Sequence, residues 1–271
     1  MSQLMLTRRS SFRPFRLAGA AALVAAATTL SACNLQISMQ AEGRSEWKKD
    51  FTLAAGGSLD IRNTNGIIEI DPSEGDKVTV TAERIAKAAT DAEAQKAAEA
   101  IEIKEAVTGS SIVLDARTTS NGLLGGNRQV KFHVRAPKGT TLTFTTTNGT
   151  IEVREMTGEL RLETTNGKIT GRGLAGTTRA QTTNGVIDLD YEAIGSGGIT
   201  AETTNGKVDI ALPKTGKAQV SSRVTNGAIN SENLNLQTSE SSRRRLTGTL
   251  NGGGPEVRVE TTNGAVSLRG K

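Results

Sequence analysis

The residues of this 271-residue chain that could most readily do chemistry are acids at a fixed offset from a repeated tripeptide. Asp188 and Asp209 each stand three residues after the glycine of a Thr-Asn-Gly copy, and Glu152 holds that offset after an earlier copy. Carboxylates on neighbouring coils could ligate calcium or act as acid and base on a polysaccharide. Thr170 interrupts the series, and the glycine-rich repeat of calcium-binding β-helices is absent. A solvated polar face explains these acids better than an ion site or a catalytic pair.

Other catalytic patterns are weak. His133 is the only histidine and stands at an alternating position in VKFHVRA, which is typical of an ordinary strand residue. Gly171, Gly173 and Gly176 form a G-x-G-x-x-G, but no helix pattern follows, so the dinucleotide interpretation fails on context. The sequence therefore predicts a protein that is not an enzyme and has neither a cofactor nor a metal.

The N-terminus has the order of a secretory signal. Four arginines precede an apolar run from Leu17 to Leu30, which is too short to span a bilayer comfortably. The tetrapeptide that ends at Cys33 resembles the lipobox of bacterial lipoproteins, which implies cleavage before Cys33 and acylation of that residue. Cys33 is the only cysteine, so it cannot form an internal disulfide. We assign residues 1–32 to a lipoprotein signal peptide and 33–48 to a tether, with a lipid anchor in a membrane.

The location of the charge argues against nucleic acid as a partner. The formal net charge is +5, but residues 1–32 contain four arginines and no acid, which leaves 29 basic against 28 acidic residues, or +1. Aromatic residues make up 3% of the chain, so few rings could stack on bases. The basicity belongs to the leader, and the remainder has no broad phosphate-binding charge.

The tripeptide Thr-Asn-Gly occurs seven times. After each glycine, apolar and polar residues alternate, as in Ile187, Asp188 and Leu189, which is the period of a strand with one buried face. A second glycine follows ten or eleven residues after several of the asparagines. We predict a structural ladder at the corner asparagines, which are Asn65, Asn148, Asn166, Asn184, Asn205, Asn226 and Asn263.

Two architectures fit this repeat. Asn-Gly is a favoured hairpin turn, so the chain could form an antiparallel meander. Alternatively, each copy is one coil of a β-solenoid, stacked on the next at about 4.8 Å. A hairpin gives no reason for threonine before every asparagine, whereas stacked Thr and Asn side chains can bond to their own copies. We therefore predict an all-β, β-solenoid or β-helix-like array in which each copy sits on the previous one.

The N-terminal half is less regular. Residues 49–136 are predicted to form a β region with a short inserted helix at about 90–100, where Thr90 and Glu93 have the spacing of a capping box. Residues 137–271 form the Thr-Asn-Gly array. The asparagine spacing widens from 18 or 21 to 37 residues between Asn226 and Asn263, which predicts a long loop or a coil that lost its corner.

Three segments together resemble the DUF4097 family, whose members are regarded as candidate adhesins of the bacterial envelope. They are FTLAAGGSLDIRNTNGIIEI, VKFHVRAPKGTTLTFTTTNGTIEV and GTLNGGGPEVRVETTNGAVSLRG. The resemblance covers nearly all of residues 49–271. It implies a β-solenoid-like fold and an envelope location, and it provides no catalytic residues.

These patterns favour a noncatalytic, lipid-anchored cell-envelope protein that presents a rigid β-repeat surface for adhesion or protein contact. The outer membrane or periplasmic face is favoured, since Asn34 rather than Asp follows the cysteine. The partner would be an envelope protein or a polysaccharide. Alternatives are a regulatory partner in envelope-stress signalling and a polysaccharide-active β-helix enzyme. Candidate surface contacts are Glu163, Asp188, Glu202 and Asp209. The run Arg243–Arg245 could touch anionic lipid or polysaccharide phosphates, although a solvated loop explains it better.

Overall fold

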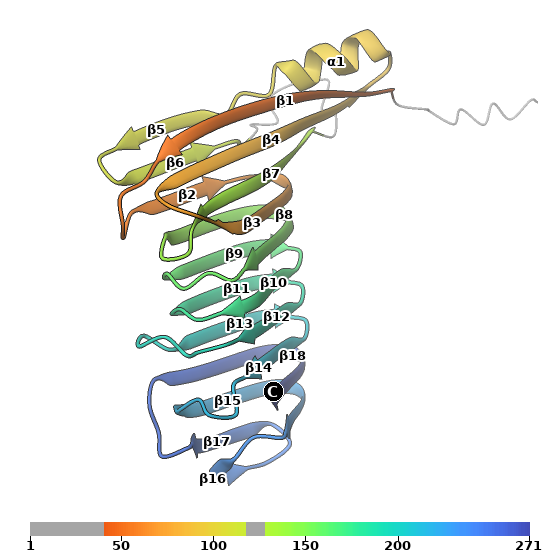
Figure 1. Cartoon of the computed structure of the whole chain (residues 1–271). Helices are drawn as coiled ribbons and strands as arrows, with labels where there is room; N and C mark the ends of the chain where they lie inside the picture. The colour runs from red at the N-terminus through yellow and green to blue at the C-terminus, as the bar shows by residue number, and fades with distance from the viewer. Residues whose placement is uncertain (1–40, 118–127) are drawn as a thin grey trace, which may run out of the picture. The chain divides into compact units, whose positions relative to one another are not determined.

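The computed structural model describes residues 41–117 and 128–271, which form strands and one helix (Figure 1). The N-terminal elements are β1 (Ala41–Thr52), β2 (Ser58–Arg62), β3 (Asn65–Ser73), β4 (Lys77–Ala88), α1 (Asp91–Glu99), β5 (Lys104–Thr108), β6 (Ser111–Asp115) and β7 (Arg128–Pro137). The repeat array comprises β8 (Thr141–Arg154), β9 (Leu160–Asn166), β10 (Ile169–Leu174), β11 (Thr178–Asn184), β12 (Ile187–Tyr191), β13 (Ile199–Asn205), β14 (Val208–Leu212), β15 (Ala218–Glu232), β16 (Leu236–Ser241), β17 (Arg245–Leu250) and β18 (Glu256–Gly270). Residues 1–32 and Cys33 lie outside the described residues, so the signal peptide and lipid anchor stay predictions.

Coils of two strands stack with parallel pairing, which confirms the solenoid-like architecture and excludes the meander. The strands that run into the Thr-Asn-Gly corner (β9, β11, β13 and the first halves of β8, β18 and β15) form one face, called here the threonine face. The strands that leave the corner (β10, β12, β14 and the second halves of β8, β18 and β15) form the opposite face, the aspartate face. Each long strand therefore contributes to both faces.

The core lies between the two faces. Alternate residues of each strand point inward, so Leu162 on β9 and Ile187 and Leu189 on β12 have no exposed surface. Each coil supplies only a few such side chains, and their burial depends on the coil above and below. The apolar residues that alternate along each strand in the sequence therefore form the core of the stack.

Glycine is required at the corner because adjacent coils approach closely there. A Cβ atom at Gly185 would collide with the carbonyl oxygen of Gly167 on the neighbouring coil, and one at Gly206 would collide with that of Gly185. In three copies, the inward threonine two positions before the asparagine closes the same gap; Thr164 Oγ1, for example, donates to the carbonyl oxygen of Gly149 at 3.2 Å. These contacts account for the corner glycine and for the inward threonine, whereas the threonine directly before the asparagine, such as Thr165, is exposed.

The coils do not follow one another in chain order at the C-terminal end. β18 lies between β13 and β14 on one side and β15 on the other, with parallel pairing to all three. The prediction that each copy sits on the previous one is therefore wrong for the Asn226 copy, because the Asn263 copy lies between it and the Asn205 copy. An antiparallel hairpin, β16–β17, fills the long interval between Asn226 and Asn263, and β17 pairs with β15. Every Thr-Asn-Gly copy can pair with any other copy, so the motif does not determine the order of the coils. The β16–β17 hairpin and the turn after it bring β18 into its place between β13 and β15.

The N-terminal region differs from expectation at its start. Residues 41–48, predicted as part of the tether, belong to β1, which pairs antiparallel with β4 along its length. β1 is an edge strand whose exposed charged residues alternate with inward positions, but only Trp47 and Phe51 among these are large and apolar, so the apolar period is weak. The helix forms where predicted, with Thr90 at the N-cap accepting from the Glu93 backbone nitrogen at 3.3 Å. Within residues 41–117 and 128–271, no helix has the length and apolar character needed to cross a bilayer.

Candidate functional site

A groove of about 640 Å³ runs across the strands of the threonine face. One wall is a column of outward side chains that are paired in register, Glu163 on β9, Gln181 on β11, Glu202 on β13 and Glu260 on β18. The other wall is a row of exposed threonines, which are Thr165, Thr183, Thr204, Thr262 and Thr225. The groove thus follows the stacking direction and crosses several coils.

Buried threonines form the floor of this groove. Thr164, Thr203 and Thr261 are at most 6% exposed, and each donates its hydroxyl to a glycine carbonyl of the adjacent coil at 3.2 to 3.4 Å. Thr182 on β11 is equally buried, and its hydroxyl has no hydrogen-bond partner among the described residues. The exposed threonines of the wall are therefore the hydroxyls that can meet a ligand.

The charge of the groove changes along its length. Glu202 accepts a hydrogen bond from Gln181 Nε2 at 2.7 Å, and Glu163 lies 3.9 Å from Arg161, a long ion pair. Glu260 is paired more closely, with Arg258 at 2.8 Å. Beyond Glu260 the column continues with Arg223 on β15. The groove is acidic along its middle coils and basic at the β15 end.

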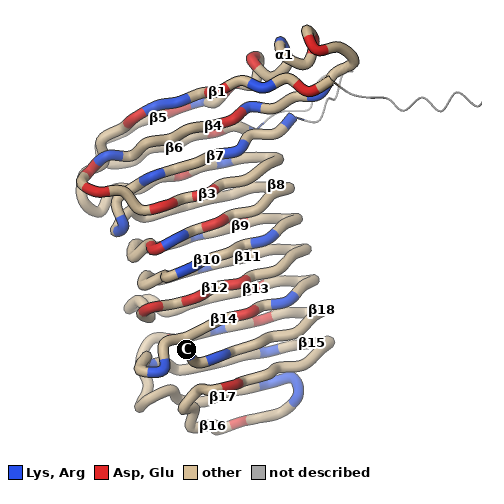
Figure 2. Tube along the Cα trace, turned by 45° about the vertical axis from the view of Figure 1, so that its right-hand side comes forward, with Lys and Arg blue, Asp and Glu red and all other residues tan. Residues whose placement is uncertain are grey.

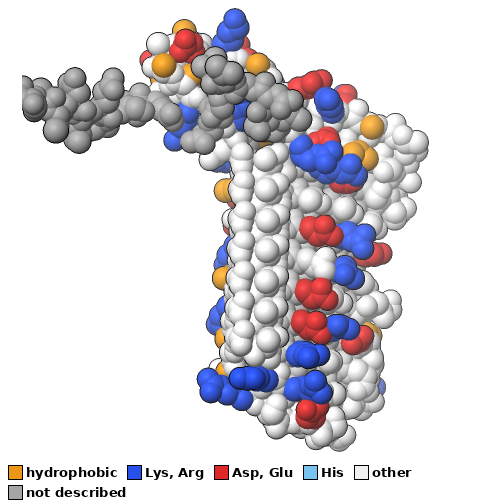
Figure 3. All heavy atoms as spheres, turned by 180° about the vertical axis from the view of Figure 1, so that it is seen from behind, with side chains coloured by type: hydrophobic (Ala, Val, Ile, Leu, Met, Phe, Trp, Pro, Cys, Tyr) orange, Lys and Arg blue, Asp and Glu red, His pale blue; other side chains and the backbone are white. Residues whose placement is uncertain are grey.

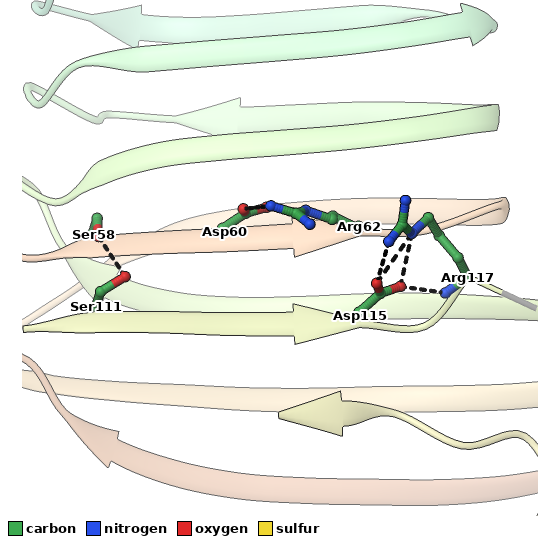
Figure 4. A network of polar contacts seen from close by, with 6 residues as sticks. All are labelled: Ser58, Asp60, Arg62, Ser111, Asp115 and Arg117. Atoms are coloured by element: carbon green, nitrogen blue, oxygen red, sulfur yellow. Dashed lines mark hydrogen bonds and ion pairs between the residues drawn. The ribbon is translucent and has the colours of Figure 1, made fainter. Parts of the chain in front are cut away.

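Ion pairs close the other end of the column (Figure 4). Arg62 on β2 lies opposite Asp115 on β6 and bonds to Asp60 on its own strand at 2.6 Å. Arg117 bonds to Asp115 through its side chain at 2.6 Å and through its backbone nitrogen at 2.9 Å. The hydrogen bonds from Arg117 lower the pKa of Asp115, so this carboxylate stays ionised and internally paired.

The acids of the aspartate face are neutralised by neighbouring cations (Figure 2). Both carboxylate oxygens of Asp188 accept from Arg172, at 2.8 and 2.5 Å, and Lys168 lies 3.6 Å away. The hydrogen bonds from Arg172 lower the pKa of Asp188 despite its partial burial. Asp209 pairs with Lys207 at 2.8 Å. Each aspartate already has its counter-charge within the chain.

The ion pairs of Asp188 and Asp209 do not favour a shared calcium ion or an acid–base pair at these two carboxylates. They are register neighbours on adjacent strands, but each is bound to a cation rather than facing a shared vacant position. In the part of the chain that the structure describes, no three His, Cys, Asp or Glu side chains group as a metal site would need. His133 is exposed and lies with Nδ1 2.9 Å from Glu69, a surface pair on the aspartate face.

The corner asparagines form one continuous side-chain ladder. Each Nδ2 donates to the Oδ1 of the next asparagine at 2.8 or 2.9 Å, in the spatial order Asn226, Asn263, Asn205, Asn184, Asn166, Asn148 and Asn65. Asn65 ends the ladder by donating to the carbonyl oxygen of Arg128 at 3.2 Å. Figure 3 shows the uncharged stripe of the stack, with acidic and basic side chains beside it. This edge of the molecule is polar, regular and uncharged.

A family model described as Toastrack DUF4097 matches residues 126–269, more than half of the chain. The chain belongs to this family. The Toastrack match spans six of the seven Thr-Asn-Gly copies, from Asn148 to Asn263, and nearly all of the inserted strand β18. No curated protein matches the chain.

Solved structures are similar over most of their length. A candidate cell adhesion protein from Clostridium sporogenes is 15% identical, with 84% of this chain and 100% of that chain covered and a TM-score of 0.46. A candidate adhesin from Bacteroides fragilis is 9% identical, with 84% and 97% covered and a TM-score of 0.33. A candidate lipid-binding protein from Parabacteroides distasonis is 9% identical, with 83% and 96% covered and a TM-score of 0.25. These likenesses carry no argument about function.

The structure divides the four candidate contact residues between two faces. Glu163 and Glu202 line the groove of the threonine face, whereas Asp188 and Asp209 lie on the aspartate face in ion pairs. Glu260 and Arg223 also line the groove and were not predicted as contacts. The segment VETTNGAV around Glu260 repeats the motif, but its place beside β13 follows only from the insertion of β18.

Proposed function

We propose that this Toastrack protein is a noncatalytic, lipid-anchored component of the bacterial cell envelope. Its threonine face binds an extended partner, an envelope protein or a polysaccharide, along the groove. The lipobox-like sequence before Cys33 supports the anchor.

The observation that carries this proposal is the groove itself. It crosses six strands, with threonine hydroxyls on each, carboxylates on three of them and an amide on a fourth. A partner that extends along the stacking direction would meet a threonine hydroxyl about every 4.8 Å. Such a surface suits a long ligand better than a compact one.

The chemistry of the lining predicts weak contacts in large number. No aromatic side chain lines the groove, and aromatic anchors usually concentrate binding energy at an interface. Exposed hydroxyls and partly paired carboxylates each contribute little when they exchange water for a ligand group. Useful affinity then depends on simultaneous engagement of several coils or several molecules.

Graded substitution tests the groove. We expect Glu163→Gln, Glu202→Gln and Glu260→Gln each to weaken capture of the partner from cross-linked envelopes by a few-fold, and the triple variant to abolish it. The matched control is Asp188→Asn with Asp209→Asn, which removes two acids from the aspartate face. Equal loss in the control would reject the groove as the binding surface. Depolymerisation of a polysaccharide by the wild-type chain, lost in any of these variants, would show an enzyme instead.

The anchor has its own test. Cys33→Ala should move the full chain from the membrane fraction to the soluble fraction of the envelope, because a protein without acyl chains loses its hydrophobic attachment. The measurement is fractionation followed by immunodetection, with mass spectrometry of the N-terminal peptide. An unmodified Cys33 in the wild-type protein would contradict the anchor and leave the groove proposal standing.

A further inference from the structure

Four arginines gather at the end of the stack that is farthest from β1. Arg243 and Arg244 occupy the turn between β16 and β17, Arg245 begins β17, and Arg223 on β15 lies directly opposite Arg245. All four are exposed, and the turn is the basic patch at the lower end of the tube in Figure 2. We call these four residues the arginine turn. Like charges directly opposite each other destabilise a sheet. Arg223 has Glu260 of β18 as its register neighbour on the other side, whereas Arg243 and Arg244 have no ion-pair partner among the described residues.

The backbone of the arginine turn is held in place. The carbonyl oxygens of Arg243 and Arg244 accept from the backbone nitrogens of Ile229 and Val224 at 3.0 and 2.9 Å. These two bonds lie on either side of the corner at Asn226, so the turn covers the end of the asparagine ladder. Ser242 Oγ accepts from the backbone nitrogen of Arg245 at 3.0 Å and fixes the turn itself. The arginine side chains therefore project from an ordered support.

Few acids oppose this positive charge. Among residues 41–117 and 128–271, the arginine turn forms a single ion pair, between Arg245 and Glu240 at 3.6 Å. The contrast with the aspartate face is sharp, since Arg172 there is saturated by Asp188. Arg223, Arg243 and Arg244 thus keep guanidinium groups available for an external anion.

Guanidinium groups match phosphate oxygens with two parallel hydrogen bonds. Arg243, Arg244 and Arg245 do not line the groove of the threonine face, and they lie on a turn at the end of the stack. A protruding turn contacts a flat surface more readily than it encloses a small anion. The chemistry and the shape together indicate a surface that carries many phosphates.

The arginine turn and the start of β1 lie on the same edge of the molecule, the one that carries the asparagine ladder. Gly43 on β1 lies opposite Ala86, which lies opposite Arg128, and the carbonyl oxygen of Arg128 receives the Asn65 end of the ladder. β1 therefore begins on the same edge that the arginine turn closes. Nine strand-to-strand steps of about 4.8 Å, or about 40 Å, separate β1 from β15. The six steps from β3 to β15 carry the uncharged asparagine ladder.

We propose that the arginine turn binds the phosphates of anionic phospholipid headgroups. The choice of a membrane as the phosphate source rests on the proposed lipid anchor, because β1, the first described strand after Cys33, begins at the same edge of the molecule. Lipid at one end of the edge and basic charge at the other provide two attachments to one bilayer. Combined lipid and polybasic signals give stable attachment where one acyl chain is marginal.

The test uses the exported full chain without its lipid, recovered from cells that carry Cys33→Ala. It is mixed with vesicles of phosphatidylcholine alone or with about one third phosphatidylglycerol, and bound protein is measured by flotation. We expect binding only to the anionic vesicles. Arg243→Gln with Arg244→Gln should lower this partition by roughly 25-fold, since each basic side chain near an anionic surface contributes about fivefold.

The matched control removes the same charge elsewhere. Arg135→Gln with Arg179→Gln takes one exposed arginine from each face and should change the partition by less than about twofold. An equal loss in this control would overturn the assignment to the turn. Arg243→Lys with Arg244→Lys keeps the charge and should retain most binding. The lysine variant should bind the vesicles, and the glutamine variant should unfold at the wild-type temperature without binding them. That result would exclude loss of the fold as the cause of the lost binding.

Two further outcomes separate the proposals. If long-chain polyphosphate binds the protein tightly while anionic vesicles do not, the turn recognises a soluble phosphate polymer and the membrane assignment is wrong. If the wild-type chain is already soluble after export, the lipid anchor fails, and the wild-type protein itself goes into the flotation assay. The arginine turn is then judged by that assay alone, and equal binding to neutral and anionic vesicles would reject it.

Discussion

Glu202 and Asp209 belong to the same coil, seven residues apart on either side of the corner at Asn205. Their carboxylates nevertheless have different partners. On the threonine face, Glu202 accepts one hydrogen bond from Gln181 and lines an open groove. On the aspartate face, Asp209 is bound by Lys207 at 2.8 Å. One repeat unit thus builds a surface that can receive a ligand and a surface whose charges are satisfied internally.

The corner itself produces this difference. Residues two apart on a strand share a face, so a cation at that spacing can neutralise an acid. Lys207 precedes Asp209 by two residues immediately after the corner glycine. The residue two after Glu202 is Thr204, because the Thr-Asn-Gly motif reserves that position for threonine. The motif that stacks the coils therefore also keeps cations away from one side of the glutamate column.

The largest expected effect comes from the interior that both faces share. Ile187→Asp places an unpaired charge in a position with no exposed surface, and we expect it to lower the free energy of unfolding by about 4 kcal/mol. The measurement is equilibrium denaturation followed by circular dichroism. Asp188→Ala, the next residue but outward, should cost about 1 kcal/mol or less. Similar losses in the two variants would contradict the assignment of inner and outer residues.

A medium effect is expected at the best-paired acid of the aspartate face. Arg172→Gln removes the bidentate partner of Asp188 and should cost about 1 kcal/mol at pH 7. The pKa of Asp188 is lowered in the folded state, so its contribution is complete above its unfolded pKa of about 4 and is lost as the pH falls below that value. The difference between wild type and variant should therefore shrink on acidification. Arg179→Gln, on the threonine face, should show no such pH dependence.

The smallest effect on stability is expected in the groove. Glu202→Gln should change the free energy of unfolding by less than about 0.5 kcal/mol, because it leaves an acceptor for Gln181 and disturbs no ion pair of the described residues. Asp209→Asn, which removes an ion pair, should cost more. Thermal unfolding of both variants under one buffer condition measures the contrast. A costlier Glu202 variant would mean that the threonine face is as internally satisfied as the aspartate face.

Much of the array was predictable from local pattern. The period-two alternation after each glycine identified strands with one buried face, and the repeated threonine favoured stacking over hairpins. The helix at Asp91–Glu99 was predictable because its capping residues are adjacent in sequence. β1 was missed because the inward positions of this edge strand hold glycine, serine and lysine beside Trp47 and Phe51, which leaves only a weak apolar period.

The candidate contacts were only partly predictable. Outward positions follow from alternation, so Glu163, Asp188, Glu202 and Asp209 could be listed as surface residues. Whether an outward acid is open or paired depends on which cation lies within reach, and Arg172 reaches Asp188 from a neighbouring strand. Likewise, Glu260 joins Glu202 only because β18 inserts beside β13.

The sequence by itself determined the all-β class, the repeating unit and the inward and outward alternation, because these depend on residues within a few positions of each other. The order of the last coils, the groove and the placement of the arginine turn were decided by the tertiary structure. Every Thr-Asn-Gly copy offers its neighbours the same backbone and side-chain hydrogen bonds, so the motif does not specify which copy lies beside which. The β16–β17 hairpin, which pairs with β15 and returns the chain for β18 to enter, settles that choice.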